Sequence, residues 1–148
     1  MIHERVYKIL LVDDDLNCLD AIEQILRRDG YDVIPVDAGR LALELLSKNS
    51  VDLAIVDLNL PDIDGLHVLH EINKHYKGIP TIIMTSEPSR EVRLASLEAG
   101  AYSFITKPIN IPIFRNIISK AIQSSKVRSM DVRRELIFIK WFRGFIHK

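Results

Sequence analysis

The chain has 148 residues, of which 47% are apolar and 27% charged, so it is long enough for one globular domain with a buried core and too short for a large multidomain enzyme. Its 20 basic and 20 acidic residues cancel, which argues against a uniformly basic nucleic-acid binder. The charges are unevenly spread. Residues 1–125 carry 13 Lys and Arg against 18 Asp and Glu, whereas residues 126–148 carry 7 against 2. An acidic body of charge −5 therefore precedes a basic segment of charge +5.

Cysteine usage and hydropathy predict a cytoplasmic protein. The single cysteine, Cys18, cannot form an internal disulfide, and the first ten residues contain no apolar signal core. The densest apolar stretch, residues 136–146, would span about 16 Å as a helix, against about 30 Å for the hydrocarbon core of a bilayer. We therefore expect no membrane-spanning segment.

Short apolar runs alternate with segments of helical periodicity along the first 125 residues. Five runs are expected to form β-strands, at residues 8–12, 31–36, 52–56, 80–84 and 102–106. A helix is expected after each run: four have apolar faces that include Leu16, Leu41, Leu66 and Ile113, and one covers about residues 89–100. Pro35 lacks a ladder donor and predicts an edge position for the second strand. Strands that are apolar on both faces predict a parallel sheet covered by helices on both sides, which is an α/β fold.

Polar residues follow four of these runs. Ligands of open parallel sheets bind beyond the carboxyl ends of the strands, and here those ends carry Asp13–Asp15, Asp57, Thr85 and Lys107. Carboxylates held close together repel one another, so such a site needs a cation, and Mg²⁺ prefers oxygen ligands of this kind. Asp57 would remain free to act as a nucleophile toward phosphorus. The Lys107 ammonium and the Thr85 hydroxyl could stabilise charge on phosphoryl oxygens.

Four segments resemble the receiver domain of two-component response regulators: ILLVDDD at 9–15, LAIVDLNLPDIDG at 53–65, IIMTSE at 82–87 and GAYSFITKP at 100–108. The likeness covers about residues 6–125, in the order and at the spacing of that family. It implies a receiver domain over residues 1–125 with a flavodoxin-like fold. That fold is a three-layer α/β/α sandwich with a five-stranded parallel sheet in the order 2-1-3-4-5.

The resemblance also implies a phosphoacceptor and a metal site. Asp57 looks like the residue that accepts a phosphoryl group from a sensor histidine kinase or a phosphotransfer protein. Asp13 and Asp14 look like the acidic pair that holds Mg²⁺ together with Asp57, and Asn59 would add its backbone carbonyl. The triple aspartate also allows Asp14 and Asp15 to be the pair, although the spacing after the apolar run favours Asp13 and Asp14.

The remaining motif residues look like those that respond to phosphorylation. Lys107 matches the family's lysine, and Thr85 matches the switch hydroxyl that turns toward the phosphoryl group. Phe104 stands at the aromatic switch position, whose ring is thought to turn inward when that hydroxyl moves. The Lys107-Pro108 bond is similar to one that is usually cis in this family.

Two other functions are compatible with parts of this sequence. Asp57 also resembles the nucleophile of haloacid-dehalogenase-type phosphatases, but that family places a second aspartate two positions on as general acid, where this chain has Asn59. The chain also has no cap domain, so we expect a signalling module and no enzyme. The alternative is a binding or dimerisation module that is not phosphorylated and whose C-terminal helix is the working part.

Residues 126–148 predict a basic amphipathic helical extension. Placed on a helix, residues 133–148 have the aromatic side chains Phe138, Trp141 and Phe145 on one side, and the other side carries Arg133, Lys140, Arg143 and His147. Such a helix could pack on its own body, on a second copy in a homodimer or on a partner protein, a membrane surface being less favoured. It could equally begin an output region. Because 23 residues cannot build a helix-turn-helix domain, we expect no DNA-binding domain in this chain.

Overall fold

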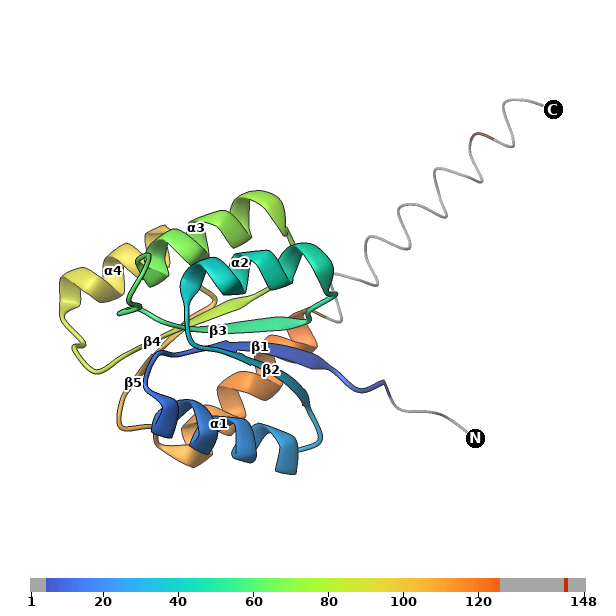
Figure 1. The fold of residues 1–148 in the computed structure, drawn as a ribbon, viewed down its shortest axis with the longest axis horizontal. Helices are drawn as coiled ribbons and strands as arrows, with labels where there is room; N and C mark the ends of the chain where they lie inside the picture. The colour runs from blue at the N-terminus through green and yellow to red at the C-terminus, as the bar shows by residue number, and fades with distance from the viewer. Residues whose placement is uncertain (1–4, 126–142, 144–148) are drawn as a thin grey trace.

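The computed structural model of the protein describes residues 5–125 and Arg143 (Figure 1). The expected extension at 126–148 therefore lies outside the described residues, apart from Arg143. The elements, in chain order, are β1 (Lys8–Val12), α1 (Leu16–Arg28), β2 (Asp32–Val36), α2 (Gly39–Lys48), β3 (Leu53–Asp57), α3 (Gly65–His75), β4 (Thr81–Thr85), α4 (Arg90–Glu98), β5 (Ser103–Thr106) and a helix over residues 111–125.

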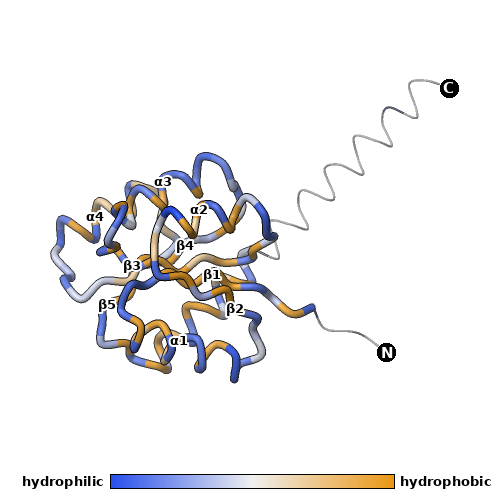
Figure 2. The backbone as a smooth tube through the Cα atoms, in the orientation of Figure 1, coloured by the Kyte–Doolittle hydropathy of each residue, from blue (hydrophilic) through white to orange (hydrophobic). Residues whose placement is uncertain are grey.

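The five strands form one parallel sheet in the order β2-β1-β3-β4-β5, as predicted. Helices α2, α3 and α4 cover one face, and α1 and the helix over residues 111–125 cover the other (Figure 1). Alternation along β1 shows why both faces are buried: Leu11 packs in one apolar cluster with Phe114, and Leu10 packs in the other with Leu69. Figure 2 shows the hydrophobic strands at the centre of the molecule. The predicted α/β class is confirmed.

Three leucine and isoleucine residues differ from expectation. Leu16, Leu41 and Ile113, which helical periodicity placed on apolar faces, are 65%, 41% and 57% exposed. Each lies in the first turn of its helix, where the chain has just left the carboxyl edge of the sheet, so less of the sheet lies beneath it.

Pro35 lies in β2 at the edge of the sheet, as predicted. No helix within residues 5–125 is long and apolar enough to cross a membrane.

The helix starts show how the loops are held. Asp15, Asp64 and Ser89 cap α1, α3 and α4 with their own side chains. Helix α2 begins after Ala38, which offers no capping side chain. Its first two amides instead donate to the carboxylate of Asp62, at 2.9 and 2.8 Å. The loop that follows β3 therefore completes the start of α2.

Candidate functional site

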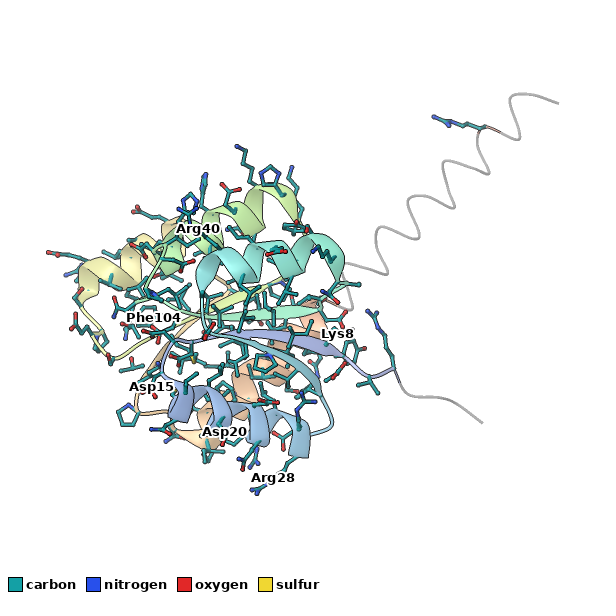
Figure 3. The ribbon with its side chains drawn as sticks, in the orientation of Figure 1. Lys8, Asp15, Asp20, Arg28, Arg40 and Phe104 are labelled. Atoms are coloured by element: carbon teal, nitrogen blue, oxygen red, sulfur yellow. The ribbon has the colours of Figure 1, made fainter. Side chains whose placement is uncertain are left out.

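The predicted site residues meet at the carboxyl edge of the sheet. Asp13 follows β1 directly, Asp57 is the last residue of β3, Thr85 is the last residue of β4, and Lys107 follows β5 directly. Figure 3 shows this end of the sheet at Asp15 and Phe104, with Lys8 at the opposite end. Because all five strands are parallel, residues far apart in the sequence arrive at one edge.

Two buried carboxylates share one ammonium group. Asp13 is 0% exposed and Asp57 is 5% exposed. In each, Oδ1 accepts a hydrogen bond of 3.0 Å from the backbone amide two residues later, of Asp15 and Asn59 respectively. The other oxygen of each accepts from Lys107 Nζ, at 2.7 Å for Asp13 and 2.6 Å for Asp57. Lys107 thus bridges the ends of β1 and β3.

The electrostatic environment shifts the pKa values of the two carboxylates in opposite directions. Burial raises the pKa of Asp57 above its ordinary value; the charge of Asp13 adds to this, and Lys107 offsets it only in part. Burial acts on the pKa of Asp13 in the same direction, but the hydrogen bonds from Lys107 and the Asp15 amide outweigh it and hold that pKa below its ordinary value. Burial opposes charge on Lys107 as well, yet the two carboxylates raise its pKa. Asp57 is therefore the carboxylate whose charge is less well compensated.

The same edge offers oxygen ligands for a hard cation. Carboxylate oxygens of Asp13, Asp14 and Asp57 all lie within 4.8 Å of one another. Asp13 and Asp57 are buried, whereas Asp14 is exposed, so the group opens to solvent on the Asp14 side. Mg²⁺ commonly takes one or two carboxylates and keeps several waters, and these residues fit that preference. Asp15 uses its carboxylate differently, accepting from two amides at the start of α1 at 3.1 and 3.3 Å.

Thr85 and Phe104 lie on neighbouring strands beside this group. The Thr85 side chain is fully buried, and its hydroxyl oxygen accepts a hydrogen bond of 3.1 Å from the Glu87 amide. Phe104 is partly buried against the apolar cluster between the sheet and helices α2 to α4, beneath the guanidinium of Arg93. The Lys107-Pro108 peptide bond is cis, as the resemblance implies.

Gly65 has a role at the site that sequence patterning did not reveal. A Cβ at this position would overlap the carbonyl oxygen of Asp57 and the Cα of Leu58. The Gly65 amide also donates to the Leu58 carbonyl at 2.9 Å. The start of α3 thus packs directly on the backbone that carries Asp57, which only glycine permits. The turn-rich segment LNLPDIDG signals a turn but gives no sign of this close approach.

Cys18 also lies beside the site. It is partly buried in α1 next to Asp13. Burial is the main cause that raises the pKa of its thiol to about 11, and the Asp13 carboxylate is the second. The thiol therefore remains protonated at neutral pH and can donate to Asp13. These surroundings do not favour the thiolate that redox chemistry requires.

Comparisons with known proteins agree with this geometry. The response regulator receiver domain family matches residues 9–129. The chain is 34% identical to the transcriptional regulatory protein GlrR of Escherichia coli over 87% of its own length and 29% of the relative, and 33% identical to ZraR of the same species over 100% and 33%. It thus spans about a third of the length of these relatives.

Solved structures give the same result. A response regulator receiver domain protein (CheY-like) from Methanospirillum hungatei is 31% identical, with a TM-score of 0.80 over 84% of this chain and 99% of that one. The HemR receiver domain from Leptospira biflexa is 32% identical, with a TM-score of 0.73 over 78% and 94%. Together with the match over residues 9–129, these likenesses show that the chain belongs to the response regulator receiver domain family of two-component signalling.

Proposed function

We propose that the chain is a phosphorylated signal receiver in which Asp57 accepts a phosphoryl group from the phosphohistidine of a sensor histidine kinase or a phosphotransfer protein. The arrangement of Asp57 carries this proposal. It is a carboxylate at the end of a buried strand, with a raised pKa, held between a backbone amide and the Lys107 ammonium. A poorly compensated carboxylate next to a fixed cation suits attack on phosphorus.

In the transfer, a carboxylate oxygen of Asp57 forms a bond to phosphorus while the bond from phosphorus to the donor histidine nitrogen breaks. The electron pair of that bond stays with the imidazole. Lys107, which already lies 2.6 Å from Asp57, would offset negative charge on the phosphoryl oxygens, and the Thr85 hydroxyl would donate to one of them. Asp13, Asp14, Asp57 and the carbonyl of Asn59 would hold Mg²⁺. When bound, the ion supplies further charge neutralisation at phosphorus.

We infer that the output is altered binding to a partner or to a second copy of the chain. A phosphoryl group on Asp57 would add negative charge beside Asp13 and accept a hydrogen bond from the Thr85 hydroxyl. Phe104 lies on the same sheet face as Thr85. Sedimentation of the full chain with and without beryllofluoride, which mimics an aspartyl phosphate, tests self-association. An unchanged sedimentation coefficient would leave binding to another protein as the output.

Phosphoryl acceptance itself is tested with the full chain, Mg²⁺ and acetyl phosphate, followed by intact mass. We expect one phosphoryl adduct on the wild type and none on Asp57→Asn. A matched control is Asp32→Asn, which changes a partly exposed aspartate at the opposite end of the sheet and should retain the adduct. Absence of the adduct on the wild type, or its survival in Asp57→Asn, would overturn the proposal. Continuous release of phosphate over many turnovers would instead support the phosphatase alternative.

A further inference from the structure

The ring of Phe104 has a cation over its face. The guanidinium carbon of Arg93, in α4, lies 5.5 Å from the centroid of the Phe104 ring, in β5. This is within the distance of about 6 Å at which a cation is attracted to an aromatic face. Among residues 5–125, no carboxylate lies within 4.0 Å of the Arg93 guanidinium. The ring is therefore the partner that the described structure assigns to this side chain.

Phe104 and Thr85 lie on the same face of the sheet. Phe104 pairs with Ile83 and Thr106 pairs with Thr85 in the parallel register of β4 and β5. Residues two apart in a strand point to the same side, so Thr85 lies on the side of Ile83 and Phe104. The Thr85 hydroxyl accepts from the Glu87 amide, in the loop that leads to α4. Both side chains are thus held by the segment that contains α4 and the loop before it.

We propose that Arg93 is a positioning residue, which holds the Phe104 ring in the arrangement where the Thr85 hydroxyl is bonded to the Glu87 amide. This inference rests on the proposed function. To donate to a phosphoryl group on Asp57, the Thr85 hydroxyl must turn away from the Glu87 amide. The Phe104 ring lies on the same sheet face, and in this proposal it moves together with that hydroxyl. Any ring movement away from Arg93 forfeits the cation–π contact, so Arg93 opposes the change.

The size of this effect follows from the exposure of Arg93. A cation–π contact at an exposed site changes an equilibrium by about two- to fivefold. Replacing Arg93 by Met, which has a similar length and no charge, should therefore strengthen beryllofluoride binding by that factor. Arg93→Lys keeps a cation within reach of the ring and should lie between the Met variant and the wild type.

The experiment is a titration of the full chain with beryllofluoride in the presence of Mg²⁺, followed by the amide resonances of Thr85 and Glu87. Arg90→Met is the matched control, because Arg90 is an exposed arginine in the same helix and makes no cation–π contact with the Phe104 ring. It should bind with the wild-type affinity. The same Arg93→Met substitution is then made in a Phe104→Leu background, where the ring is absent and the substitution should have no effect.

Each outcome decides the matter. Tighter binding in Arg93→Met that disappears in the Phe104→Leu background supports the inference. Unchanged or weaker binding in Arg93→Met, or an equal gain with and without the ring, overturns it while the proposed function stands. A wild type that binds no beryllofluoride overturns the proposed function itself, and the inference with it.

Discussion

The ends of β1 and β3 carry the same device and use it differently. A buried aspartate stands at each, Asp13 directly after β1 and Asp57 as the last residue of β3, with one oxygen accepting from the backbone amide two residues later and the other from Lys107. Yet the pKa of Asp13 is lowered and that of Asp57 is raised. The two carboxylates compete for one ammonium group, and Asp13 retains the better-compensated charge. The same hydrogen-bond pattern can therefore accompany opposite pKa shifts. The direction of each shift depends on how the charge of the shared ammonium group is divided between the two carboxylates.

The backbones that follow differ as well. After β1, the chain enters α1 within three residues and Asp15 caps that helix. After β3, a loop over residues 58–64 comes before α3, and Asp62 in this loop caps α2. The end of β1 is thus tied to its own helix, whereas the end of β3 is tied to two helices. Substitutions confined to one end therefore test the two ends separately.

Lys107→Met removes the group that both ends share and should have the largest effect. Two buried carboxylates would lose their cation, which costs about 3 kcal/mol of unfolding free energy at neutral pH. Urea unfolding in EDTA measures this loss, and Mg²⁺ should restore more stability to the variant than to the wild type. Lys74→Met, at an exposed position of α3, is the control and should unfold like the wild type. Equal stability of Lys107→Met and wild type would show that Lys107 does not compensate these charges.

Gly65→Ala acts on the β3 end alone. The added Cβ would press on the backbone of Asp57 and Leu58, which cannot yield as a side chain does, so we expect a loss of about 2 kcal/mol. Phosphoryl uptake from acetyl phosphate should fall as well, because the strand end that carries Asp57 must shift. Gly39→Ala is the matched control, since its Cβ would meet the side chain of Ile63 instead. It should lower stability while leaving uptake near the wild-type rate; equal rates in both variants would contradict the role of Gly65.

Asp14→Ser and Asp15→Ser test the β1 end and show whether Asp13 and Asp14, or Asp14 and Asp15, form the metal-binding pair. Asp14 contributes an oxygen to the cluster that it forms with Asp13 and Asp57, so its loss should weaken Mg²⁺ binding by about tenfold. Serine can cap a helix as aspartate does, so Asp15→Ser should preserve α1 and leave Mg²⁺ affinity nearly unchanged. Calorimetric titration with Mg²⁺ measures both. A larger loss in Asp15→Ser than in Asp14→Ser would make Asp14 and Asp15 the metal pair.

Much of this arrangement could be predicted from the sequence because it depends on local patterns. Apolar runs located the five strands to within about a residue, and parallel strands bring their carboxyl ends together, which is how Asp13, Asp57 and Lys107 could be grouped. Contacts between loops and helices could not be predicted in this way. The Asp62 cap on α2 spans 22 and 23 residues, and the position of Arg93 over Phe104 depends on how α4 packs on β5. Neither of these contacts produces a periodic pattern in the sequence.

Asp57→Asn should have the smallest effect on stability, and its sign distinguishes the two aspartates. The folded-state pKa of Asp57 is raised, so its ionised form destabilises the fold at neutral pH, and this penalty disappears as the pH falls below the unfolded-state value of 3.8. In EDTA, Asp57→Asn should therefore raise the unfolding free energy slightly at neutral pH, with a gain that shrinks on acidification. Asp13→Asn should do the opposite: the lowered pKa of Asp13 contributes stability above 3.8, and that contribution is lost as the pH falls through the folded-state pKa. Urea unfolding at a series of pH values measures both slopes. If the two variants changed stability in the same direction at neutral pH, the two carboxylates would not be competing for Lys107 in the way that their shared hydrogen bonds indicate.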